Sequence, residues 1–169
     1  MLKNFTASSE GLTIAPTTAS TVADYFIREA NETGSYLSNL KLQKLVYYAQ
    51  AWYLAIYGKP LFDEDFQAWI HGPVIPELYQ QYIDFGWKPI LKDVEQPNFP
   101  EEIQKFLQEV TEVYFGCDAF ELERMTHHED PWVKARGNIP MDEPSSAIIT
   151  KESMKDYYQT RVAEESQEA

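Results

Sequence analysis

The sequence is poor in several features that particular classes of protein need. Cys117 is the only cysteine among its 169 residues, so no disulfide can form within the chain. Basic residues are few, 14 against 27 acidic ones, and the formal net charge of −13 opposes binding to phosphate backbones. We find no run of about 18 apolar residues that would span a bilayer and no secretory h-region. We therefore expect a cytoplasmic protein that contacts neither nucleic acid nor membrane.

Aromatic and apolar residues, in contrast, are plentiful. Hydrophobic residues make up 44% of the chain and aromatic ones 14%, which is enough for a core without a metal or a disulfide. Four tryptophans and eleven tyrosines are heavy usage for this length, and such side chains are common at interface hot spots. Most should lie in the core, while Tyr79 and Tyr82 are candidates for contact with a partner. The acidic surface would favour association with a basic partner.

Apolar residues recur at helical spacing along most of the chain, which predicts a mainly α fold. We expect a single compact helical domain of about six to seven helices with one or two short strands. Leu42–Ile56 has a broad apolar face, and beyond Leu45 apolar residues occur on almost every side, so that helix should lie in the middle of the bundle. The expected organisation is a flexible tail over 1–19, the helical domain over 20–163 and an acidic, frayed end over 164–169.

Capping residues and glycines place the boundaries of the expected elements. The helices should begin near Ser20 or Thr21 (with Thr21 and Asp24 as a capping box), near Ser38 or Asn39, at Pro76, at Pro100, after Asp118, at Asp130 and after Thr150. The second helix should end at Gly58, the third near Phe85, the fourth at Gly116 and the sixth at Gly137. Alternation over Phe66–His71 predicts a strand that Gly72-Pro73 breaks, and a second short strand is considered at Pro89–Leu91.

One cluster of residues is a candidate for a metal site or a catalytic site. His127-His128-Glu129-Asp130 follows Cys117 by ten residues, but adjacent histidines on a helix diverge and do not share a face for a metal. A Cys–His nucleophile pair through Cys117 has no supporting motif. The sequence therefore favours no catalytic, metal or cofactor-binding residue. A small enzyme that uses His127 or His71, with or without a metal, stays open as an alternative.

Three segments together resemble the Panacea domain, a family of SocA-like antitoxins of bacteria and phages. They are Leu40–Phe62, Ala68–Tyr79 and a third that joins Leu122, Thr126-His127 and Pro131-Trp132, with Ile149 opening the last helix. The resemblance covers roughly 20 to 160. It implies an antitoxin that neutralises a co-encoded protein toxin by direct binding, while the toxin class does not follow from it. An adaptor that delivers a partner to host machinery is the second alternative.

The resemblance also marks signature residues, which serve either as scaffold or as a partner-binding site. They are Lys44, Tyr47, Trp69, His71, Gly72, Pro73, Tyr79, Thr126, His127, Pro131 and Trp132. Scaffold is the favoured role: Lys44 would keep its charge exposed while its stem covers apolar surface, and Gly72-Pro73 would fix a turn. The alternative is a shared functional groove around Trp69, His71, His127 and Trp132.

Overall fold

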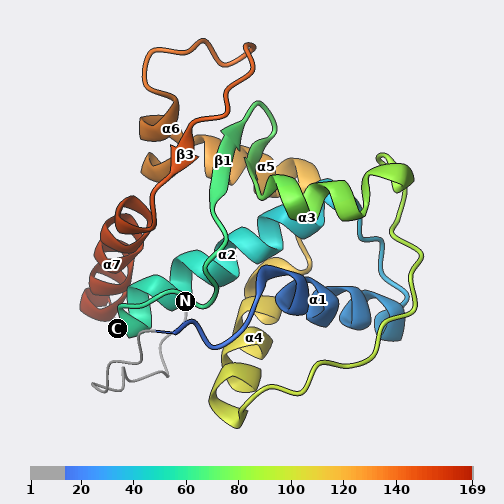
Figure 1. Ribbon diagram of the computed structural model, residues 1–169. Helices are drawn as coiled ribbons and strands as arrows, with labels where there is room; N and C mark the ends of the chain where they lie inside the picture. Colours follow the sequence, from blue (N-terminus) through green and yellow to red (C-terminus); the bar gives the residue numbers. More distant parts are fainter. Residues whose placement is uncertain (1–13, 169) are drawn as a thin grey trace.

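Seven α-helices and a small three-stranded sheet build the computed structural model, which describes residues 14–168 (Figure 1). The mainly α prediction is confirmed. The helices are α1 (Ala19–Thr33), α2 (Asn39–Tyr57), α3 (Pro76–Gln81), α4 (Glu101–Tyr114), α5 (Ala119–His127), α6 (Asp130–Arg136) and α7 (Lys151–Glu168). The strands are β1 (Phe66–Trp69), β2 (Gly72–Val74) and β3 (Ile148–Ile149), and a short 3-10 helix spans Ile83–Phe85.

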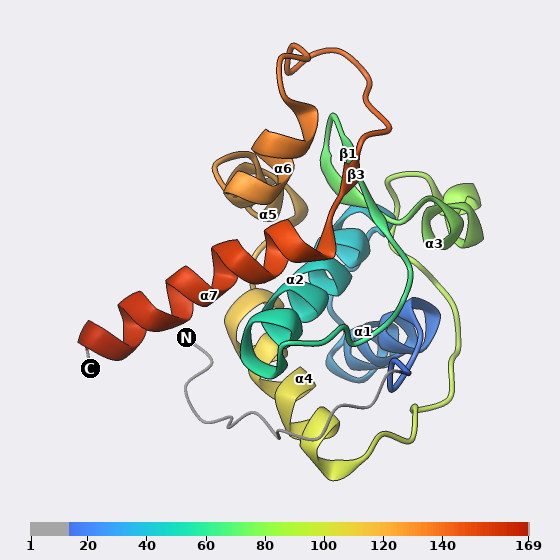
Figure 2. The same ribbon diagram turned by 60° about the vertical axis from the view of Figure 1, so that its left-hand side comes forward.

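Helix α2 runs through the middle of the molecule, as its apolar sequence predicts. All but two of its residues are buried, and α1, α4, α5 and α7 surround it in both views (Figures 1 and 2). The Ser38 side chain accepts the backbone N–H of Lys41 at its start. Gly58 ends it in the left-handed conformation, and its N–H donates to the Leu54 carbonyl. Both predicted ends are confirmed.

Several other helix ends also follow from local capping. Asp118 caps α5 by accepting the Glu121 N–H, and Thr150 accepts the Ser153 N–H at the start of α7, both as predicted. Two starts were wrong by one or a few residues. Thr18, not Thr21, caps α1, because its hydroxyl accepts the Thr21 N–H and leaves Thr21 inside the first turn. Helix α6 was expected to begin with Asp130 as its N-cap, but the N-cap is Glu129, one residue earlier, which has an extended backbone.

The third helix is shorter than predicted. Helix α3 ends at Gln81, and the chain continues as the 3-10 turn after Tyr82 leaves helical geometry. Tyr82 is only 1% exposed, so its prediction as a partner-contact residue is wrong. The break at Tyr82 allows its ring to join the core, where burial of its apolar surface is favourable.

The sheet contains one strand more than the sequence predicted. Gly72 and Pro73 do not break the strand; the chain turns at Ile70-His71 and they form β2, paired with β1. Proline is tolerated there because β2 is an edge strand in the order β2-β1-β3. Strand β3 was not predicted: Ile149, expected to open the last helix, pairs with Phe66 of β1 instead, and α7 begins at Lys151. The Ala68 N–H adds a bond to the Ala147 carbonyl. The strand considered at Pro89–Leu91 is reduced to one bridge between Ser38 and Pro89.

The two chain ends differ in what the structure describes. Most of the predicted tail, residues 1–13, lies outside the described residues. Its remainder contacts the domain, since the Thr17 N–H donates to the Leu61 carbonyl and the Ala19 N–H to a Glu64 carboxylate. Helix α7 continues to Glu168, through the segment predicted to fray. Among residues 14–168, no helix has the length and apolar character needed to cross a membrane.

Candidate functional site

The Lys44 side chain lies inside the molecule, contrary to the prediction of an exposed charge. It is 1% exposed, and its Nζ donates to the Pro73 carbonyl at 3.3 Å. Space for it exists because Gly72 has no side chain: a Cβ there would lie 2.5 Å from Lys44 Cε and 3.0 Å from the Thr126 hydroxyl. Three signature residues, Lys44, Gly72 and Thr126, therefore fit together as one packing unit that joins α2, β2 and α5.

Burial changes the acidity of Lys44. Removal from water lowers the pKa of its ammonium group from 10.5 to about 7, and the nearby Glu123 carboxylate opposes this shift. Between pH 7 and 10.5, Lys44 is therefore protonated in the unfolded chain but has largely lost its proton in the native protein. Stability associated with Lys44 is therefore present above about pH 10.5 and is lost as the pH falls through about 7.

We expect the Lys44→Met variant to lose this pH dependence. In the wild type, the free energy of unfolding should rise between pH 7 and 9, with a slope approaching about 1.4 kcal/mol per pH unit for one proton. Methionine keeps the long apolar stem but does not titrate, so the variant should give a flatter profile and a more stable protein at pH 7. Urea unfolding at several pH values measures both. Equal slopes of unfolding free energy against pH in the two proteins would contradict a buried Lys44 whose pKa is lowered.

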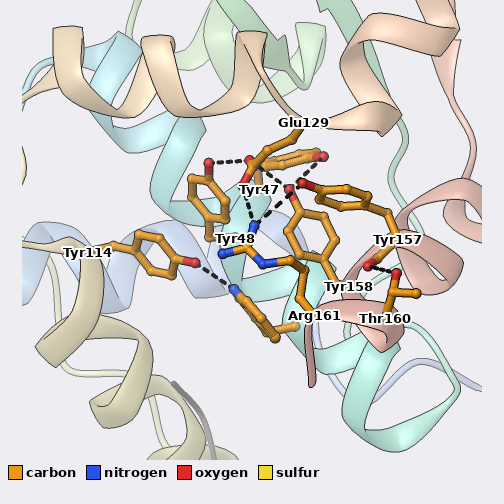
Figure 3. Close-up of polar contacts among 9 residues, drawn as sticks. Tyr47, Tyr48, Tyr114, Glu129, Tyr157, Tyr158, Thr160 and Arg161 are labelled. Carbon is orange, nitrogen blue, oxygen red and sulfur yellow. Dashed lines mark hydrogen bonds and ion pairs between the residues drawn. The ribbon is translucent and has the colours of Figure 1, made fainter. Parts of the chain in front are cut away.

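A second buried cluster surrounds the carboxylate of Glu129 (Figure 3). The Tyr48 hydroxyl donates to it at 2.6 Å and the Tyr158 hydroxyl at 2.9 Å, while Arg161 approaches its other oxygen at 3.5 Å. Burial raises the pKa of Glu129 above its usual 4.5, and the two tyrosine hydrogen bonds oppose this shift. The carboxylate thus connects α2 with α7 at the joint that precedes α6.

Other aromatic side chains complete this cluster. The hydroxyl oxygens of Tyr47 and Tyr158 lie 3.4 Å apart, the Trp52 indole N–H donates to the Tyr114 hydroxyl at 2.6 Å, and the Tyr48 and Tyr114 rings stack. All five side chains are at most 2% exposed. The signature residue Tyr47 therefore belongs to the scaffold. Sequence reasoning missed Glu129 as the acceptor for the hydroxyls of Tyr48 and Tyr158. The signal available was a pair of tyrosines on a buried helix, whose hydroxyls require partners.

Arg136 links strand β1 to the loop that follows α6, and the sequence analysis did not identify it. It is 3% exposed; its guanidinium donates to the carbonyls of Ala68 at 2.8 Å and Pro140 at 2.7 Å, and to that of Glu143. It also covers the Trp132 ring. These bonds hold the loop 137–147, which projects from the top of the molecule in Figures 1 and 2, against β1.

Trp132 and His127 pack beneath the hairpin. The rings of His127 and Trp132 stack at 4.0 Å, and the Trp132 indole N–H donates to the Trp69 carbonyl at 2.8 Å. Burial lowers the pKa of His127, and Glu123 opposes this. Pro131 is buried in the first turn of α6. Trp132 therefore supports the β1–β2 hairpin, with His127 stacked on its ring and Pro131 buried next to it in the chain.

Trp69 and His71, in contrast, reach the surface. Together with Tyr79, Leu40, Ile70 and Pro144 they line an open groove of about 560 Å³, which we call the Trp69 groove. The Trp69 and Tyr79 rings meet edge to face at 5.2 Å, and His71 Nδ1 lies 2.7 Å from the Glu123 carboxylate. Of the four residues considered for a shared groove, the structure places two on its wall. His127 and Trp132 are not among the lining residues.

A second open cleft lies between the start of α2 and the joint of α4 with α5. It has a volume of about 610 Å³ and includes Tyr36, Lys41, Phe115 and Phe120, and we call it the Phe120 cleft. Lys41 Nζ donates to the Phe115 carbonyl at 2.6 Å. Phe120 and Tyr36 are exposed. The sequence did not indicate this cleft, because its walls come from two segments, 35–41 and 115–120, that are distant along the chain.

The surroundings of Cys117 do not favour a nucleophilic thiolate. Burial raises the pKa of the Cys117 thiol, and Glu121 beside it acts in the same direction, whereas a reactive thiol needs a lowered pKa. Within residues 14–168, no three His, Cys, Asp or Glu side chains are grouped in a way that would hold a metal ion.

Comparison with known proteins identifies the family. The family model described as "Antitoxin SocA-like, Panacea domain" matches residues 42–133, more than half of the chain. The chain belongs to the SocA-like Panacea family. Antitoxin SocA of Caulobacter vibrioides (strain NA1000 / CB15N) is 38% identical over 73 residues, which is 43% of this chain and 39% of that relative. The aligned part is therefore well under two thirds of the relative's length, and no solved structure matches the chain.

The Panacea match divides the Trp69 groove between two parts of the chain. All eleven signature residues, from Lys44 to Trp132, lie inside the matched segment. Pro144 and Arg136, which form and anchor the outer wall, lie outside it. The groove thus joins a floor from the family segment with a wall from a region beyond it.

Proposed function

We propose that this protein is an antitoxin of a toxin–antitoxin system, and that it neutralises a co-encoded toxin by direct protein–protein binding. Membership of the SocA-like Panacea family supports the antitoxin role, and the relative from Caulobacter vibrioides bears the name Antitoxin SocA. The single cysteine agrees with action in the cytoplasm, where thiols stay reduced.

The observation that carries the binding mechanism is the placement of aromatic side chains at an open groove. Trp69 and Tyr79 are only half-buried and line about 560 Å³ of accessible space. Rings of this kind supply large contact area and are enriched among interface hot spots. The titratable residues Lys44 and Glu129, in contrast, are buried and already bonded within the protein. This arrangement suits recognition of another protein better than chemistry on a substrate.

The test is a growth-rescue experiment with the product of the adjacent gene. That gene is expressed in a bacterial host from an inducible promoter, alone or with this protein, and the pair is then co-purified. We expect toxicity that this protein relieves, together with a stable complex of the two chains. An immunoblot of the toxin during rescue separates sequestration, which leaves its level unchanged, from delivery to a protease. A toxic neighbour that this protein neither rescues nor binds would contradict the proposal.

A further inference from the structure

We propose that the Trp69 groove is the toxin-binding surface and that it receives one large apolar side chain from a toxin segment flanked by lysine or arginine. This inference rests on the proposed antitoxin function and adds where the toxin binds and what chemistry its contact segment has.

The interior of the groove is apolar. Trp69, Tyr79, Leu40 and Ile70 contribute its walls. Three of the polar side chains that line it are bonded within the protein: Gln67 accepts the Trp69 indole N–H at 2.9 Å, Glu123 holds His71 at 2.7 Å, and Ser145 accepts the Ala147 N–H at 3.1 Å. A charged side chain placed inside would lose water without gaining a free counter-charge, which is costly. An apolar side chain gains by leaving water there.

Backbone pairing is not the means of recognition at this hairpin. Strand β1 is paired with β2 on one side and β3 on the other. On the outer edge of β2, Pro73 has no N–H and its carbonyl accepts the Lys44 ammonium, while the Ile75 N–H donates to Gln43. A partner strand would find few free groups to pair with. The β1–β2 hairpin therefore offers a partner side chains rather than free backbone groups.

Two exposed carboxylates belong to segments that contribute lining residues to the groove, and we call them the rim charges. Glu77 lies in α3 with Tyr79, and Glu143 directly precedes Pro144; within residues 14–168 neither carboxylate forms an ion pair. These charges, with the net charge of −13, attract a basic segment and repel a second copy of this chain. The occupant is accordingly a different protein with basic residues on both sides of its apolar anchor.

The groove is shaped before a partner arrives. Its floor is fixed by the Trp132 indole bond to the Trp69 carbonyl, and its outer wall by the Arg136 bonds to Pro140 and Glu143. A site held in this way needs little ordering on binding, so more of the contact energy appears as affinity.

The Trp69→Ala/Tyr79→Ala double variant tests the location of the site. Its matched control is Tyr36→Ala/Phe120→Ala, which removes two aromatic rings from the Phe120 cleft of similar volume. Calorimetric titration with the purified product of the adjacent gene should give a Kd weakened about 100-fold or more by the groove variant, and by less than about threefold by the control. Circular dichroism confirms that both variants are folded.

Three results of this titration are informative. Loss of affinity in the groove variant alone supports the inference. Unchanged affinity in the groove variant, above all with loss in the Phe120-cleft control, overturns the inference while the proposed function stands. Absence of binding by the wild type overturns the proposed function and this inference together. The single variant Tyr79→Ala, whose ring is only half-buried, repeats the test if the double variant does not fold.

The rim charges supply an independent test that leaves the core unchanged. Glu77→Lys/Glu143→Lys is compared with Glu112→Lys/Glu152→Lys; all four residues are exposed, and both variants change the net charge equally. Stopped-flow measurements at low salt should show an association rate about tenfold lower for the rim variant than for its control, with the gap closing at high salt. Equal rates for the two variants would overturn the assignment of a basic toxin segment to this rim.

Discussion

Replacement of Gly72 by alanine is expected to lower the free energy of unfolding by about 3 kcal/mol or more. Gly72 has a φ of +104°, which an L side chain rarely adopts, and the added Cβ would lie 2.5 Å from Lys44 Cε. Lys44 is buried and its Nζ donates to the Pro73 carbonyl, so a shift of its side chain would disturb that bond. Urea unfolding followed by circular dichroism measures the change.

Gly58→Ala is the matched control for this prediction. Gly58 also has a positive φ of +74°, but nothing lies within 4 Å of a Cβ built there. The control should therefore show only the backbone strain, about 1 to 2 kcal/mol. Adding Lys44→Ala to Gly72→Ala should remove the steric part, so that the double variant is more stable than the sum of the two single effects predicts. A Gly72→Ala cost no larger than that of Gly58→Ala would contradict the close packing.

Replacement of Glu129 by alanine is expected to lower the free energy of unfolding by about 3 kcal/mol. The variant leaves the hydroxyls of Tyr48 and Tyr158 buried without their acceptor and opens a space beside them. Tyr158→Phe is the milder comparison, because it removes one hydroxyl and keeps the carboxylate, and should cost about 1 kcal/mol. Equal effects of the two variants would mean that the carboxylate does not organise the cluster.

The pH dependence of Glu129 has the opposite sign to that of Lys44. Because burial raises the pKa of Glu129 above 4.5, the native protein holds this proton more tightly than the unfolded chain does. The stability of the wild type relative to Glu129→Gln should therefore be greatest below about pH 4.5 and fall as the pH rises through the native pKa. Thermal unfolding of both proteins between pH 4 and 7 checks the sign, and a difference that grows with pH would refute it.

Much of the helical framework was determined by the sequence alone. The start of α2 at Ser38, its end at Gly58 and its central position follow from a capping hydroxyl, a glycine and an apolar surface on almost every side. The same holds for the caps Asp118 and Thr150. These features depend on residues within one or two turns of each other, and such local interactions can be read along the chain.

The candidate site was predictable only in part. The signature residues were identified by resemblance, but periodicity could not separate Tyr79, which lines the groove, from Tyr82, which is buried three residues later. The helix ends between them, at Gln81, and this is why one ring lines the groove and the other is buried. Arg136 and Pro144 carried no local sign of their role, because they act through a loop that folds back on β1.

Only the tertiary structure decided which polar groups are buried and which aromatic rings stay accessible. Lys44 enters the core because Gly72, on another element, leaves room for it, and its acceptor Pro73 lies 29 residues away. Tyr48 is satisfied by Glu129 across 81 residues. The free energy of burying such a group depends on the partner that meets it after folding, and one residue's neighbours along the chain do not specify that partner.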